Sequence, residues 1–136
     1  LVTLLRGTYH HMHANKQWYL PADLCAAKGL DTDAIAHGVV DERQQHTLAD
    51  IVYEVAAQAH AHLDAGAKLL AQVQPSRERT RALYSLLPAV KTKLVLDVLQ
   101  KEGFDVMNPE LLQRSGPQQL RHQFQLLKAT WTGKFM

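Results

Sequence analysis

At 136 residues, 46% of them hydrophobic and 21% charged, the chain has the composition of one soluble globular domain. No stretch reaches the roughly 18 consecutive apolar residues of a membrane span, and the single Cys25 excludes an internal disulfide framework. The net charge of +2 is unevenly divided: residues 1–67 carry four basic and eight acidic side chains, and residues 68–136 carry eleven basic and five acidic ones. The basic C-terminal half favours either an anionic partner (RNA, lipid or acidic protein) or a merely solvated face.

The apolar spacing predicts helices throughout the chain and no convincing strand, so the predicted fold class is all-α, a packed helical bundle. Gly29 is a natural left-handed stop for a helix, and Pro88 should kink or split the helix that contains it. Residues 39–46 are predicted to be a polar connection, after which Thr47 caps the longest helix. In chain order the predicted helices cover residues 1–13, 22–28, 31–37, 48–73, 76–87, 89–102, 108–114 and 118–131.

The longest predicted helix carries one apolar stripe at steps of three and four residues, which predicts a buried face. Several positions in the stripe are Ala or Gly, so a neighbouring helix can approach closely. The stripe consists of Leu48, Val52, Val55, Ala59, Leu63, Gly66, Leu70 and Val73.

The next helix begins with arginines, which the helix dipole disfavours at this end. These residues are therefore candidates for contacts with an anionic partner. The candidate contact residues are Arg77, Arg79, Arg81, Lys91 and Lys93.

Residues 115–117, Ser-Gly-Pro, predict a break before a terminal helix. That helix should carry Leu120, Phe124, Leu127 and Trp131 on one side. Cys25 lies among apolar residues on a short helix and is expected to be a small core residue.

The order and spacing of several short motifs resemble the squalene/phytoene synthase family. These motifs are Leu4-Leu5-Arg6, Tyr19-Leu20-Pro21, the short helix ending at Gly29, the long Ala-rich helix, Ala82-Leu83-Tyr84 and Leu87-Pro88. The resemblance implies a helical bundle of the isoprenoid (trans-prenyl) synthase type. It covers residues 1–115, with residues 116–136 forming a terminal helix, and we expect the whole chain 1–136 to be a single unit equivalent to the C-terminal half of the family domain.

Two further stretches resemble a divergent branch of that family, the branch of the mitochondrial complex I assembly factor 6 proteins. They are residues 50–63 (Asp-Ile-Val-Tyr-Glu-Val-Ala-Ala-Gln-Ala-His-Ala-His-Leu) and residues 103–109 (Gly-Phe-Asp-Val-Met-Asn-Pro). This branch is non-catalytic, so the resemblance implies protein–protein contacts and a mitochondrial location, in the matrix or on the matrix face of the inner membrane.

Catalytic members of the family carry acidic residues between the Arg and the Tyr-Leu-Pro motif, and these bind Mg²⁺ bridged to the substrate diphosphate. Between Leu1 and Pro21 this chain has no Asp and no Glu. Hard Mg²⁺ requires oxygen ligands, and imidazole is a poor substitute. We therefore expect a pseudo-enzyme with no metal and no cofactor. The degenerate former diphosphate and metal site would consist of Arg6, Thr8, His10, His11, His13 and Lys16.

Two other interpretations of this stretch stay open. His10 and His13 share a helix face, but two histidines at this spacing are at best half of a zinc site. Arg6, Lys16 and the histidines would alternatively form a residual pocket for an anionic headgroup.

Three functions are compatible with the sequence. The first is a non-catalytic protein that assists assembly of mitochondrial respiratory complex I. The second is a permanent structural subunit of a large mitochondrial assembly, either a ribosome or a respiratory complex, with a basic surface toward RNA, lipid or protein. The third is an active prenyltransferase, against which the missing carboxylates argue. Expected partners are proteins of a mitochondrial complex, with RNA or anionic lipid as alternatives. The N-terminal half would be a separate chain, a disordered region or lost.

Overall fold

The computed structural model describes residues 2–38, 41–108 and 116–134, and these residues form helices and no strand. The prediction of an all-α protein is therefore confirmed over the described part of the chain. The helices are α1 (Val2–Asn15), α2 (Ala22–Lys28), α3 (Thr32–Ala36), α4 (Glu42–Gln72), α5 (Arg77–Leu86), α6 (Pro88–Lys101) and α7 (Gly116–Thr132).

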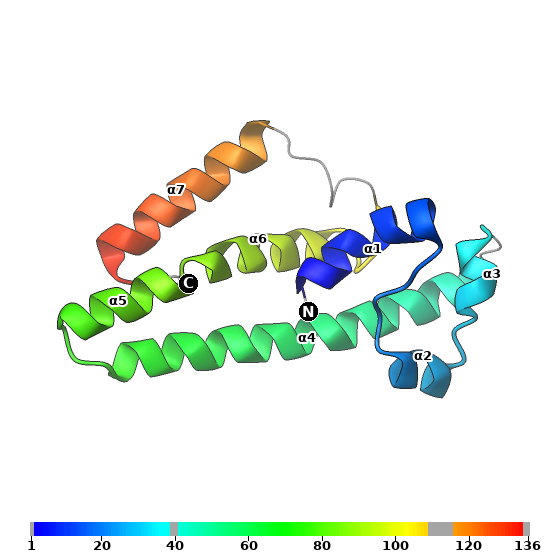
Figure 1. Cartoon of the computed structure of the whole chain (residues 1–136), viewed down its shortest axis with the longest axis horizontal. Helices are drawn as coiled ribbons and strands as arrows, with labels where there is room; N and C mark the ends of the chain where they lie inside the picture. Colours follow the sequence, from blue (N-terminus) through cyan, green and yellow to red (C-terminus); the bar gives the residue numbers. More distant parts are fainter. Residues whose placement is uncertain (1, 39–40, 109–115, 135–136) are drawn as a thin grey trace.

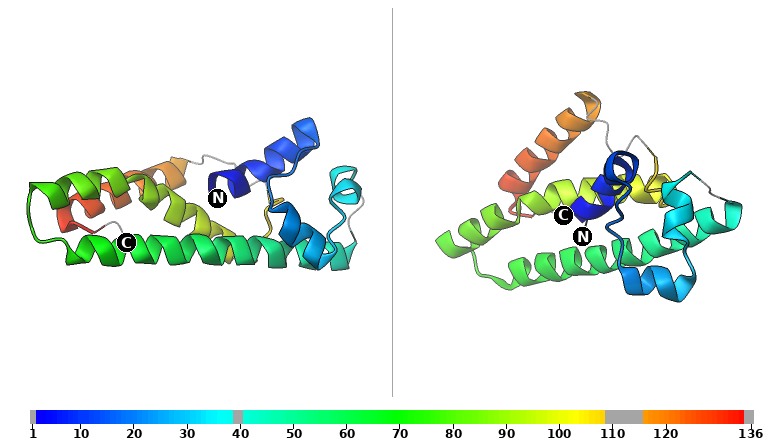
Figure 2. Two further views of the ribbon diagram at one scale, coloured as in Figure 1. Left: turned by 60° about the horizontal axis from the view of Figure 1, so that its bottom comes forward. Right: turned by 45° about the vertical axis from the view of Figure 1, so that its right-hand side comes forward.

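The long helix α4 spans the length of the molecule, and α5 and α6 return along it (Figure 1). At one end α1 packs against α4 and α6, and α2 packs against α4. α7 packs against α6 (Figures 1 and 2). Ala129 of α7 lies in one buried cluster with Leu70 of α4, so α4 and α7 meet at the same small core.

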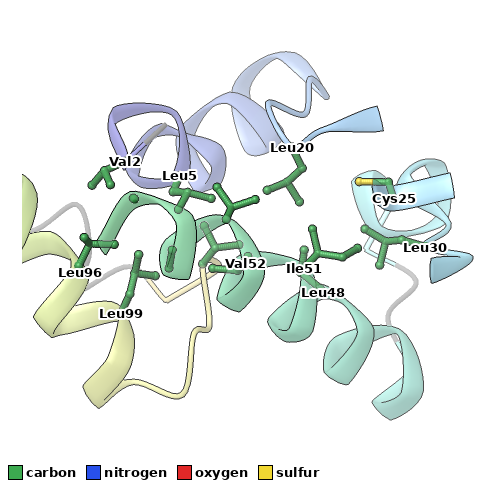
Figure 3. Packing of buried hydrophobic residues seen from close by; sticks show 14 of the residues in the cluster. Val2, Leu5, Leu20, Cys25, Leu30, Leu48, Ile51, Val52, Leu96 and Leu99 are labelled. Atoms are coloured by element: carbon green, nitrogen blue, oxygen red, sulfur yellow. The ribbon is translucent and has the colours of Figure 1, made fainter. Parts of the chain in front are cut away.

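Two clusters of buried side chains hold these helices together. The larger cluster joins α1, α2, α4 and α6, and Ile51, Val52 and Leu99 at its centre are fully buried (Figure 3). The smaller cluster has Leu70, Leu83, Val90 and Ala129 as its buried members. Five of the eight stripe residues predicted for the long helix are buried, whereas Leu63 and Gly66 are half-buried and Val73 is exposed at the helix end.

The ends of the short helices follow the sequence closely. α2 covers the predicted residues 22–28, and Gly29 terminates it with a φ of 66°, a left-handed conformation that glycine adopts without steric cost. Asp31 caps α3, because its side chain accepts a hydrogen bond from the backbone N–H of Ala34 at 2.9 Å. Ser76 caps α5 in the same way, through the N–H of Arg79.

The predicted start of the long helix is wrong. Asp41, not Thr47, is the N-cap, and its carboxylate accepts a hydrogen bond from the N–H of Gln44 at 2.6 Å. Thr47 lies inside the helix, where its hydroxyl donates to the carbonyl of Arg43. The polar residues 42–46 form an exposed first turn and so resemble a loop in composition, although their backbone is helical.

Other boundaries differ from the predictions by one or two residues. α1 continues to Asn15, two residues beyond the predicted end. Gly116 and Pro117 were predicted in a break but belong to the first turn of α7. Proline has no backbone N–H, and this costs nothing in the first turn because N–H groups there have no partner within the helix. Pro88 does split its helix, and it is the first residue of α6. The helix predicted for residues 108–114 falls almost wholly outside the described residues.

Cys25 is 5% exposed and belongs to the larger cluster, as expected for a core residue. Burial, and secondarily the charge of Asp23, raises the pKa of the Cys25 thiol above its ordinary value. Since the thiolate is the reactive form, both the low thiolate fraction and the burial slow its reactions. We expect a thiol-specific reagent at mildly alkaline pH to react at least about tenfold more slowly with the native protein than with the urea-unfolded protein. Equal rates in the two states would contradict this placement, and Cys25→Ala is the control for reagent background.

Candidate functional site

The former diphosphate site predicted from the sequence lies along α1 and the segment that leads to α2. The inner face of α1 is closed by buried side chains at steps of three and four residues: Val2, Leu5, Thr8 and Met12. Leu20 closes the far end of the segment and is also buried. This face of the helix therefore contributes packing to the larger cluster rather than groups that project toward solvent.

Thr8 is fully buried, and its hydroxyl donates a hydrogen bond to the carbonyl of Leu4 at 3.0 Å. The hydroxyl has its hydrogen-bond partner within its own helix, so it does not need a ligand as a partner. In the family pattern the position of Gly7 or Thr8 would carry the first carboxylate. Thr8 is instead packed in the core, where it is closed to solvent.

His11 takes up the space beside Gly7. A side chain at Gly7 would begin 3.2 Å from the imidazole Cδ2 of His11, so the absence of a Cβ there allows the ring to lie close to the helix. The ring also meets Tyr19 edge-to-face, with centroids 4.6 Å apart, and His10 at 5.6 Å. The short segment after α1 thus folds back so that Tyr19 covers His11.

The remaining predicted site residues do not converge on one point. His10 and Lys16 are exposed, whereas Thr8 points into the core. Lys16 has a φ of 55° and follows the end of α1, so its backbone leaves the helix there. The side chains of Arg6 and His13 lie outside the part of the chain that the structure describes. Among the described residues, no group of three or more His, Cys, Asp or Glu side chains is arranged to hold a metal ion.

Two buried ring nitrogens in this region, Nδ1 of His11 and Nε1 of Trp18, have no hydrogen-bond partner among the described residues. His11 lies in α1, and Trp18 lies in the segment between α1 and α2. The sequence marked His11 as a candidate but gave no sign of its contact with Tyr19, because eight residues and the end of a helix separate them.

The basic residues predicted as partner contacts separate into two groups. The Arg79 guanidinium donates to the carbonyl of Val73 at 2.7 Å, and Lys93 forms an ion pair with Asp97 at 3.0 Å. Arg79 therefore stabilises the carbonyl end of α4, which explains one of the arginines in an otherwise unfavourable position. Arg77, Arg81 and Lys91 are exposed and are the members of the set that remain accessible to a partner.

Another ion pair joins α2 to α4. The ammonium of Lys28 contacts the carboxylate of Glu54, and this hydrogen bond raises the pKa of Lys28. Because the pair is accessible to solvent, its contribution to stability is small. No helix in the described ranges combines the length and apolar content that crossing a bilayer requires.

Comparison with known proteins identifies relatives of this chain. The chain is similar to proteins named NADH dehydrogenase (ubiquinone) complex I, assembly factor 6: 30% identical to the protein from Rattus norvegicus, 29% to that from Mus musculus and 28% to that from Homo sapiens. Each match extends over 115 residues, which are 85% of this chain and 32% of the relative. The chain thus spans about a third of the length of these curated relatives.

No solved structure matches the chain at a significant level. The family model for squalene/phytoene synthase matches residues 1–126, which include α1 to α6 and more than half of α7. The all-helical architecture agrees with the helical isoprenoid synthase type of fold that the sequence motifs imply. On this match, the chain belongs to the squalene/phytoene synthase family.

Proposed function

We propose that the chain is a non-catalytic member of this family that works through protein contacts in the assembly of mitochondrial complex I. The observation that carries the assembly role is the similarity, over 85% of the chain, to relatives named as complex I assembly factor 6. The same similarity supports a mitochondrial location, and the proposal places the chain in the matrix or on the matrix face of the inner membrane. Protein partners are then the components of that assembly.

The residue content of α1 supports the absence of catalysis. Ionising an allylic diphosphate requires Mg²⁺ on carboxylates, and residues 1–21 contain neither Asp nor Glu. Buried Thr8 and the packing of His11 against Gly7 and Tyr19 occupy the helix positions where such carboxylates would stand. We infer that Arg6, Thr8, His10, His11, His13 and Lys16 are the remnant of a diphosphate site.

The proposal is tested by deleting the gene in its source cells and measuring assembled complex I on native gels. We expect fully assembled complex I to fall severalfold while the other respiratory complexes keep their level, and the wild-type gene to restore it. A double charge reversal at exposed residues, Arg77→Glu with Lys91→Glu, should restore it less well. The matched control reverses two other exposed charges, Arg43→Glu with Lys68→Glu, and should restore it fully.

Two results would contradict the proposal. Unchanged complex I after deletion would remove the assembly role. Turnover of a prenyl diphosphate by the purified protein with Mg²⁺ would remove the non-catalytic role. Stoichiometric recovery with the mature complex, in a native pull-down read by mass spectrometry, would instead identify a permanent subunit; an assembly role requires recovery with intermediates.

A further inference from the structure

The terminal helix α7 turns its large apolar side chains away from the protein. Leu120, Phe124 and Leu127 are 67%, 69% and 59% exposed, and Trp131 is 89% exposed. The residue of α7 that is buried in the smaller cluster is Ala129, at 3%. A helix held only by its core contacts would present its large residues inward, so the orientation of α7 leaves an unpartnered apolar face. We call Leu120, Phe124, Leu127 and Trp131 the α7 stripe.

The α7 stripe is narrow and straight. At 100° per residue its four members fall within an arc of about 60°, and Ala129 lies on the opposite side of the helix. Arg121 and Lys128 flank the stripe on one side, about 70–90° from its centre. Along the chain, residues 111–136 contain no Asp or Glu, and Lys134 lies two residues beyond the end of α7. The exposed face of α7 therefore combines Leu, Phe and Trp with positive charge only.

Charge complementarity selects the occupant of this face. A second copy of the chain would bring the same cations against themselves, which disfavours a symmetric pairing of two α7 helices. An occupant that is negatively charged at its surface and apolar beneath it complements both the basic residues and the α7 stripe. Helices with Trp, Phe and Leu on one side and Lys or Arg beside them lie in the interface of anionic bilayers.

We propose that α7 is a membrane-surface helix that docks the protein on anionic lipid, with the α7 stripe in the acyl boundary and Lys128 and Lys134 at the headgroups. A guanidinium nitrogen of Arg121 lies 4.0 Å from a carboxylate oxygen of Asp97 in α6, so the charge of Arg121 is partly neutralised within the protein. Four apolar side chains in line along a helix match a flat, fluid surface, since no shaped pocket is required of the partner. The proposal needs only the surface of α7 and does not depend on the role in complex I assembly.

The test is sedimentation of the purified full chain with vesicles at about 0.15 M salt. We expect binding to vesicles of phosphatidylcholine mixed with phosphatidylserine and at least about tenfold weaker binding to phosphatidylcholine alone. Trp131 also provides a direct signal, because its fluorescence should shift to shorter wavelength as the ring leaves water. In the variant Trp131→Phe the protein should still bind while this shift is lost, which separates Trp131 from half-buried Trp18.

The variants separate the two parts of the face. Phe124→Ser with Trp131→Ser should weaken vesicle binding by more than about tenfold, because both rings lose their transfer from water. Lys128→Gln with Lys134→Gln should weaken it about tenfold and remove the preference for anionic lipid. The matched controls change residues of the same kind that are also exposed, on α4, and should leave binding unchanged: Tyr53→Ser with Leu69→Ser, and Arg43→Gln with Lys68→Gln. Helix content by circular dichroism verifies that each variant is folded.

The proposal is overturned if the wild-type chain does not bind the anionic vesicles, or if the α7 and control variants bind equally. It is also overturned if the chain is a dimer in solution by light scattering and the Phe124 and Trp131 variant is a monomer, because the α7 stripe is then an interface between copies. Binding of an acidic protein through α7 in the absence of vesicle binding overturns it as well.

Discussion

Replacing Thr8 with aspartate is expected to destabilise the protein by about 3–5 kcal/mol at neutral pH, because the new carboxylate would be buried without a partner. Thr8 has no exposed surface, and its neighbours on the inner face of α1 are apolar. This is one of the two positions where the family pattern places its first carboxylate. A large loss of stability would mean that the catalytic residue cannot simply be put back, because the helix now packs where a metal site would stand.

Urea unfolding followed by circular dichroism measures this effect. Burial raises the pKa of a carboxyl group, so the loss of stability should grow as pH rises above about 4, where the unfolded carboxyl ionises. Thr8→Val keeps the size and should cost no more than about 1.5 kcal/mol. His10→Asp adds the same charge on the exposed side of α1 and should change stability by less than about 0.5 kcal/mol. Equal stability of Thr8→Asp and His10→Asp would contradict the burial of Thr8, because the face of α1 that carries it would then be open to solvent.

Replacing Ile51 with alanine is expected to lower the free energy of unfolding by about 2–5 kcal/mol. Ile51 is 0% exposed in the larger cluster, where it meets residues from several helices (Figure 3). The loss combines the transfer free energy of the removed carbons with the cavity left behind. Thermal unfolding should show a fall in Tm of about 6–15 °C for a chain of this size.

Leu69→Ala is the matched control for Ile51→Ala, since Leu69 lies on the same helix and is 64% exposed. We expect it to change the free energy of unfolding by less than about 1 kcal/mol. A similar effect of both substitutions would mean that the face of α4 toward α1 and α6 does not form the core.

Local signals in the sequence predicted much of the fold. A proline, seven residues and a glycine define α2, because both the start and the stop depend on backbone conformations that those two residues adopt readily. The start of α4 was missed for a physical reason: residues 42–46 are polar because they face water, and a solvated first turn has the composition of a loop. The contact of Asp31 with Gln44, whose side chain accepts the Asp31 N–H at 3.0 Å, joins segments thirteen residues apart and leaves no periodic trace.

The sequence predicted which residue types the candidate site contains, but not how their side chains pack. The absence of carboxylates between Leu1 and Pro21 can be counted in the sequence. The packing of His11 between Gly7 and Tyr19 depends on where the chain turns after α1, which no spacing rule gives. The orientation of α7 was equally hidden: periodicity predicts which residues share a side of a helix, but the direction of that side depends on what the helix packs against.

The two core clusters have a consequence for how the molecule opens. They share one contributor, the half-buried Leu63 of α4, so the two ends of α4 are held by different side chains. Regions with separate packing can open as separate cooperative units, at free energies that range up to that of global unfolding. The end formed by α5, α7 and the last turns of α4 can therefore loosen while α1, α2 and the middle of α4 stay native. The two clusters are then two cooperative units joined by α4 and α6, which contribute side chains to both, and the outward-facing α7 belongs to the unit with the smaller core.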